Sequence, residues 1–146
     1  MPEHQARIEV LPGEGVQGAR FGEDRATHRE RFGTFESFER NPGDGLTDMY
    51  PGKLLMLYYD KQDKLTFIEV SAGGAEVVWD GVSLVGQPLG TVLEALRAKG
   101  VEPVFDDDST FELPEQGIGL YTTAPDELDE PIEGVSVHPV GQGQSS

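Results

Sequence analysis

The sequence predicts an α+β domain made of two repeats, each a helix followed by an antiparallel meander, that share one curved sheet with both helices on one face. Two observations carry this prediction. A glycine-rich lead-in, a helical stretch and two extended runs follow one another in the same order twice along the chain. Gly and Pro, with 19 and 10 residues, are frequent enough to favour turns and short strands over long helices. A length of 146 residues suits one domain, with repeats over about 7–71 and 75–138 and a flexible tail over 139–146.

The two halves also share positions at a nearly constant offset. Equivalent residues lie 63 to 67 positions apart. The pairs are Gly22 and Gly86, Gly33 and Gly100, Tyr58 and Tyr121, and Val70 and Val135. A repeated order of this kind indicates duplication of one unit.

In the first half, residues 7–11 suit a strand because they are rich in β-branched and apolar side chains. A helix is expected over 23–32, since acidic residues stand at its start and a glycine follows its end. Strands are then expected over 54–59 and 65–70, joined by the polar turn 60–64.

The second half begins with strands expected over 75–79 and 82–85. The helix that follows has its apolar residues at i, i+3, i+4 and i+7, which makes one stripe at the helical period. These residues are Leu89, Val92, Leu93 and Leu96, between Pro88 at the start and Gly100 at the end. The remaining strands are expected over 103–105, 110–113, 117–123 and 135–138, with an acidic loop over 124–131.

Charge is distributed unevenly along the chain. The formal net charge is −16, and the last 46 residues hold 11 acidic residues with no Lys or Arg. This composition excludes a nucleic-acid binder, because such proteins need a basic surface. An excess of one sign governs association rather than fold, so the acidic half is either a solvated face or a surface for a basic partner.

Membrane and redox chemistry receive no support from the sequence. The longest apolar run, Leu54–Tyr59, is far below the ~20 residues that span a bilayer. The chain has no Cys, which excludes disulfides, thiolate catalysis and cysteine zinc sites. The polar start of the chain has no visible export signal, so we expect a cytoplasmic protein.

Motifs that resemble catalytic or cofactor sites have structural explanations. Residues 13–18 match G-x-G-x-x-G, but Pro12 and Glu14 do not suit a phosphate loop, so tight turns explain these glycines. Ser83 and Ser136 lie in strand-like segments without the turn that exposes a nucleophile. The histidines have no metal-ligand spacing. We therefore predict no catalytic residues, metal ligands or cofactor.

Two acidic runs leave one alternative open. Three consecutive aspartates point in different directions, whereas Ca²⁺ prefers ligands at alternating positions of a loop. A cation site requires these aspartates to converge with the acidic loop over 124–131. Otherwise the runs are acidic turns that end strands and discourage edge pairing.

The layout resembles small bacterial domains of the BamE-like and β-lactamase-inhibitor-protein kind. The resemblance rests on the lead-in Gly18–Gly22, the helix ends at Phe32–Gly33 and Gly100, and the strands containing Leu57–Tyr59 and Leu120–Tyr121. It covers most of the chain in layout. It implies a protein that acts by binding other proteins rather than by catalysis.

We therefore predict a non-enzymatic acidic binding module, for instance an immunity or inhibitor protein, that engages a protein with a basic surface. The sequence leaves its oligomeric state open. Alternatives are a metal- or ligand-binding protein or an enzyme that uses the acidic loops, and, more weakly, a DNA mimic. The predicted contact residues are Asp106, Asp107, Asp108, Glu112, Asp126, Glu127, Asp129 and Glu130, with Tyr58, Tyr121 and Trp79 as aromatic anchors.

Overall fold

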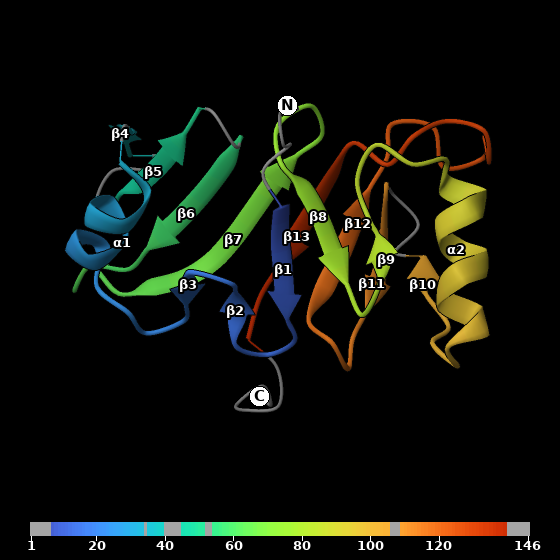
Figure 1. Ribbon diagram of the computed structural model, residues 1–146, viewed down its shortest axis with the longest axis horizontal. Coiled ribbons are helices and arrows are strands. Elements are labelled where there is room, and N and C mark those ends of the chain that lie inside the picture. The colour runs from blue at the N-terminus through green and yellow to red at the C-terminus, as the bar shows by residue number, and fades with distance from the viewer. Residues whose placement is uncertain (1–6, 34, 40–44, 52–53, 106–108, 140–146) are drawn as a thin grey trace, which may run out of the picture.

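The computed structural model describes residues 7–33, 35–39, 45–51, 54–105 and 109–139, which form two β-sheets and two helices (Figure 1). The sheets lie one in front of the other, and a helix lies at each end of the molecule. Among these residues no helix is long and apolar enough to cross a membrane.

The larger sheet has eight antiparallel strands in the order β10-β11-β12-β13-β7-β6-β5-β4. Strands β7 and β13 meet at its centre, where Ser136 pairs with Glu69. Each half of the sheet is therefore a four-stranded meander. The strands are β4 Glu36–Phe38, β5 Thr47–Tyr50, β6 Leu55–Tyr59, β7 Leu65–Ser71, β10 Val104–Phe105, β11 Thr110–Leu113, β12 Ile118–Tyr121 and β13 Gly134–Val137.

The smaller sheet has five strands in the order β3-β2-β1-β8-β9. Its central strands, β1 and β8, run parallel, with Ile8 opposite Val77. The outer pairs are antiparallel. The strands are β1 Arg7–Leu11, β2 Gly15–Val16, β3 Ala19–Arg20, β8 Glu76–Trp79 and β9 Val82–Ser83.

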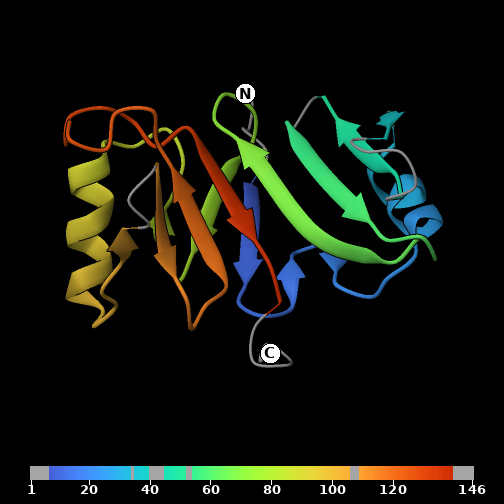
Figure 2. The same ribbon diagram turned by 180° about the vertical axis from the view of Figure 1, so that it is seen from behind.

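The hydrophobic core lies between the two sheets. On β7, Ile68 and Val70 are buried in it, while Phe67, Glu69 and Ser71 alternate with them on the other face of the sheet. The same alternation on β6, β12 and β13 sends one set of apolar side chains inward. As a result the eight-stranded sheet has one face packed on the core and one face that no described element covers (Figure 2).

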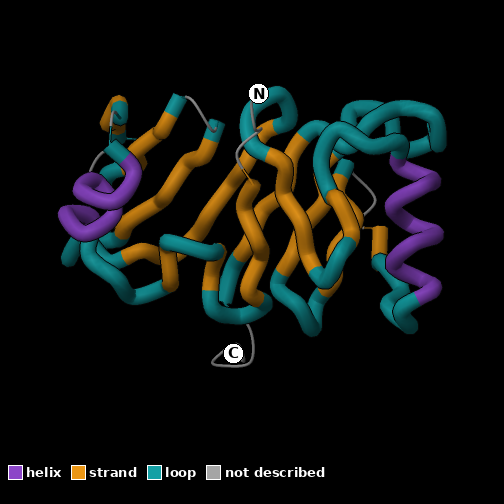
Figure 3. Tube along the Cα trace, viewed as in Figure 1, coloured by secondary structure: helices purple, strands orange, loops and turns teal. Residues whose placement is uncertain are grey.

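The helices occupy the two ends of the core layer (Figure 3). Helix α2, Leu89–Ala98, buries the predicted stripe of Leu89, Val92, Leu93 and Leu96. Helix α1, Arg25–Phe32, buries only His28, so it is held by polar contacts rather than by an apolar stripe.

The predicted fold class is wrong. Of the described residues, 43% are in strands and 15% in helices, and they build two sheets instead of one curved sheet with helices on one face. The layer that covers the core side of the eight-stranded sheet is mostly a second sheet rather than helices. The predicted glycine-rich lead-ins pair there as the two-residue strands β2, β3 and β9. Positive φ angles at Gly13, Gly18 and Gly81 allow the tight turns of this sheet. The division into repeats over about 7–71 and 75–138 stays a prediction, and residues 140–146 of the predicted tail lie outside the described residues.

Candidate binding face of the eight-stranded sheet

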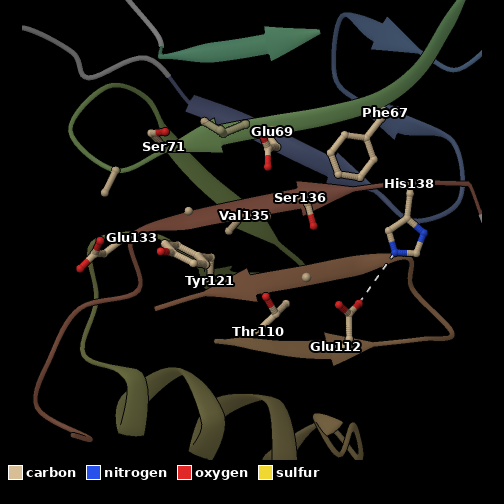
Figure 4. A pocket seen from close by; sticks show the side chains of 14 residues that line it. Phe67, Glu69, Ser71, Thr110, Glu112, Tyr121, Glu133, Val135, Ser136 and His138 are labelled. Carbon is tan, nitrogen blue, oxygen red and sulfur yellow. Dashed lines mark ion pairs between the residues drawn. The ribbon is translucent and has the colours of Figure 1, made fainter. Parts of the chain in front are cut away.

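The uncovered face of the eight-stranded sheet contains a hollow of about 780 Å³. We call this region the open face. It spans β7, β13, β12 and β11 and the ends of the adjoining loops (Figure 4). It is lined by Phe67, Glu69, Val70, Ser71, Ala72, Thr110, Glu112, Gly119, Tyr121, Glu133, Gly134, Val135, Ser136 and His138.

Strand register places four polar or small residues in one row across the open face. Glu69 on β7 pairs with Ser136 on β13. Ser136 pairs with Gly119 on β12, which pairs in turn with Glu112 on β11. Because neighbouring strands are about 4.8 Å apart, the backbones of the two glutamates are separated by about 14 Å. The centre of the row is therefore a shallow site with a carboxylate on each side.

Gly119 lies at the centre of this row and is buried beneath neighbouring side chains. A Cβ at this position would lie 2.6 Å from Ser136 Oγ, 3.3 Å from Thr110 Cγ2 and 3.6 Å from Glu112 Oε1. Side chains from both neighbouring strands thus lean over the glycine, and two of them bring oxygen acceptors. Any larger residue would displace them.

Aromatic rings border the row on one side. His138 lies nearly parallel to Phe67, with an interplanar angle of 11° and ring centroids 6.5 Å apart. Phe67 meets Tyr58 edge to face at 5.2 Å. His138 also faces Glu112, with Nε2 and Oε1 3.9 Å apart (Figure 4). These rings offer flat apolar surface beside the carboxylates.

Neutral hydroxyl groups orient the other two carboxylates of the open face. The Tyr58 hydroxyl donates to Glu69 Oε1 at 2.5 Å. The Thr123 hydroxyl donates to Glu133 Oε2 at 2.7 Å. These bonds position the carboxylates without neutralising them. Among the described residues, no Lys or Arg forms an ion pair with Glu69, Glu112 or Glu133, so the face keeps its negative charge.

Charged groups around α1 are arranged differently. Arg29 donates from Nε to Asp48 Oδ2 at 2.7 Å and from Nη2 to Oδ1 at 2.9 Å. Asp48 is 0% exposed, and the Arg29 guanidinium also stacks 4.1 Å from the Phe35 ring centroid. The hydrogen bond to Asp48 is the main reason that the pKa of Arg29 is raised. The two charges of this pair neutralise each other, so neither is available to a ligand.

His28 completes the polar cluster of α1. Its side chain is fully buried, with Nδ1 2.9 Å from the Tyr59 hydroxyl and Nε2 2.9 Å from Glu23 Oε1. Because a carboxylate only accepts, Nε2 carries a hydrogen. Desolvation works against ionisation of Glu23, but hydrogen bonds from the Arg20 backbone and His28, with the charge of Arg31, lower its pKa. All these groups serve the fold.

The structure brings three of the predicted contact residues to the open face. Glu112 and Tyr121 line the hollow, and Tyr58 lies beside it against Glu69 and Phe67. Trp79 does not belong to this face, because it lies on the smaller sheet and packs on the core.

The predicted acidic loop is exposed and lies at the α2 end of the molecule. Backbone N–H groups of Leu89 and Gly90 donate to the carbonyls of Glu130 and Leu128, which ties the loop to the start of α2. Its predicted contact residues Asp126, Glu127, Asp129 and Glu130 therefore stand apart from the row across the open face. Asp106, Asp107 and Asp108 lie outside the described residues.

Residues that sequence reasoning missed include Glu69, Gly119, Ser136 and His138. The alternation of residues along two strands could have indicated this face. Phe67 and Glu69 alternate with buried residues on β7, and Ser136 on β13 and His138 directly after it alternate with buried Val135 and Val137. Their meeting on one face depends on the pairing of β7 with β13, strands that are distant in sequence.

The chemistry available to the open face is recognition of positive charge. Within the described ranges, no three His, Asp or Glu side chains are placed to hold a metal ion.

No known protein family, curated protein or solved structure matches the chain.

Proposed function

We propose that the protein is a non-enzymatic binding module whose open face engages a basic protein partner, as an immunity or inhibitor protein does. The observation that carries the proposal is the hollow of about 780 Å³ lined by three glutamates with no Lys or Arg among its described lining residues. A partner with basic side chains supplies the missing charge. We also propose that this interaction takes place in the cytoplasm. The chain has no Cys, and cytoplasmic proteins rarely contain disulfides.

Local features favour the open face over the net charge of −16 as the origin of specificity. Long-range attraction to a strongly acidic protein speeds encounter but does not select an orientation. The open face adds shape, fixed carboxylates and aromatic surface from Phe67, Tyr58 and Tyr121. Aromatic residues at the centre of an interface are common anchors of binding energy.

A pair of charge-matched triple variants tests the proposal. The first, Glu69→Gln/Glu112→Gln/Glu133→Gln, removes three carboxylates from the open face. The second, Asp126→Asn/Glu127→Gln/Asp129→Asn, removes the same number from the exposed loop. Binding of a synthetic peptide of alternating arginine and alanine is measured by calorimetry at low and high salt.

We expect the face variant to lose about tenfold or more in affinity and the loop variant less than about threefold. Added salt should weaken binding of the unmodified protein, since exposed charges are screened. Equal losses in the two variants would mean that net charge alone attracts the peptide, and the proposal would be wrong.

A further inference from the structure

The centre of the open face has the features of a site for one planar cation. We infer that the hollow between Glu69 and Glu112 seats a single guanidinium group, an arginine side chain of the partner. This inference rests on the proposed function and names the chemical group that the face recognises. Three observations carry it: the position of the carboxylates, the two oxygen acceptors above Gly119 and the nearby rings.

The carboxylates of Glu69 and Glu112 lie on opposite sides of the proposed guanidinium site, which we call the seat. A group above Ser136 and Gly119 lies about 7 Å from the backbone of each glutamate, given the spacing of strands in a sheet. Glutamate side chains shorten this distance, and Glu112 Oε1 already leans over Gly119. A guanidinium has five N–H donors on a flat fork, so it reaches acceptors on opposite sides at once. A lysine ammonium is a compact point charge and reaches only one side well.

Gly119 lets oxygen atoms approach the centre of the row, because Ser136 Oγ and Glu112 Oε1 lie close to where its side chain would be. Both oxygens are acceptors, and no Lys or Arg lines the hollow among the described residues. The basic group beside Glu112 Oε1 is His138 Nε2, 3.9 Å away. The rings of Phe67 and His138 flank the row and provide apolar surface. Guanidinium is less strongly hydrated than ammonium and stacks on aromatic faces, so this half-apolar site favours arginine.

Three matched probes test the inference: the amides of N-acetyl-arginine, N-acetyl-lysine and N-acetyl-citrulline, titrated into the ¹⁵N-labelled protein. Citrulline keeps the shape of arginine without its charge. We expect arginine to bind about tenfold more tightly than lysine, and citrulline to cause no saturable shift. Equal affinities for arginine and lysine, or no arginine-induced shifts on β12 and β13, would overturn the inference.

Variants locate the seat. Glu112→Gln should lower the affinity for the arginine probe about tenfold, whereas Glu94→Gln, the same change on the exposed side of α2, should leave it unchanged. Gly119→Val should abolish binding because any side chain at this position displaces Ser136 and Glu112 from the centre of the row. Thermal unfolding shows whether the Gly119 variant is folded, and the Glu112 result decides the outcome if it is not.

The guanidinium group comes either from a partner protein or from a free small molecule. A peptide with one arginine between alanines distinguishes these two sources. Tighter binding of this peptide than of the arginine amide supports a partner chain as the source. Equal binding contradicts that source and assigns the seat to a free guanidine compound. If the face triple variant still weakens binding of the basic peptide but arginine binds no more tightly than lysine, the guanidinium site is wrong and the proposed function is still supported.

Discussion

The α1 end of the molecule and the open face use charge in opposite ways. At the α1 end, four acidic groups pair with a basic residue of the chain, among them Asp48 with Arg29 and Asp63 with Arg25. On the open face, Glu69 and Glu133 are held by neutral hydroxyl groups. The same residue types therefore stabilise the fold in one place and remain available to a ligand in the other.

This difference matters because the protein has 27 acidic residues and only 11 basic ones. The basic residues are concentrated where a short helix without an apolar stripe needs polar contacts. Strands β7, β13, β12 and β11, which carry the open face, form no ion pair with Lys or Arg among the described residues, and their other side is packed on the core. Its carboxylates therefore remain available for binding without a cost in folding stability.

The largest effect is expected at the pair between Arg29 and Asp48. Arg29→Met leaves a fully buried carboxylate without its cation, so we expect the free energy of unfolding to fall by about 3–5 kcal/mol. Urea unfolding measures this loss. Arg97→Met, which breaks the exposed pair with Glu102, is the control and should cost less than about 1 kcal/mol. Similar losses in the two variants would show that the α1 end does not depend on its ion pairs.

A smaller effect is expected from Tyr59→Phe. The change removes the hydroxyl that contacts His28 Nδ1, and leaves a buried ring nitrogen without that partner. Such a loss costs about 1–3 kcal/mol in the free energy of unfolding. On the open face, Tyr58→Phe removes the hydroxyl that contacts Glu69, but water can replace it. We expect a stability loss below about 1 kcal/mol there, and a larger loss for Tyr58 than for Tyr59 would contradict the comparison.

An alkaline titration sharpens the contrast. Burial raises the pKa of Tyr50 to about 12, and burial also raises the pKa of Tyr59. The unfolded chain loses these protons near pH 10, so the folded state is stabilised by them below pH 10 and loses that stability as the pH rises toward 12. Tyr50 has no hydrogen-bond partner among the described residues, so Tyr50→Phe should cost little at pH 7.

Above pH 10 the variant should lose stability less steeply than the unmodified protein, by up to about 1.4 kcal/mol per pH unit. Chemical unfolding at several pH values between 8 and 11 gives the two slopes. Parallel slopes would show that Tyr50 ionises in the folded state as readily as in the unfolded chain.

The smallest effect on stability is expected at the open face itself. Glu69→Gln and Glu112→Gln should each change the free energy of unfolding by less than about 0.5 kcal/mol, because neither residue pairs with Lys or Arg among the described residues. Thermal or urea unfolding checks this. A loss of several kcal/mol in either variant would mean that these carboxylates belong to the fold.

The sequence predicted the elements that have a clear period. Helix α2 was predicted from its stripe of Leu and Val, and strand β7 from its run of β-branched and apolar residues. In the second sheet, strands β1, β8 and β9 were expected, but β2 and β3 were missed because strands of two residues are too short for any period to show. Strand β5 was not among the expected strands, although Thr47, Asp48 and Tyr50 are buried. Burial of a charged residue such as Asp48 depends on Arg29 from a separate element, which local patterns do not reveal.

The candidate site was predictable only in part, for the same reason. Glu112, Tyr58 and Tyr121 could be chosen by residue type, as an acidic residue and aromatic anchors. The importance of Gly119 arises from the side chains that lean over it from β11 and β13. That arrangement depends on strand pairing across the sheet, and register between distant strands is set by the packing of the whole core.

The central claim is that the open face, rather than the acidic surface in general, binds a basic partner. Its most direct test maps amide shifts of the ¹⁵N-labelled protein during titration with the arginine-alanine peptide. We predict that the largest shifts fall on β7, β13, β12 and β11 around Ser136 and Gly119. Shifts that concentrate on the loop over 124–131, or spread evenly over the acidic surface, would contradict the claim.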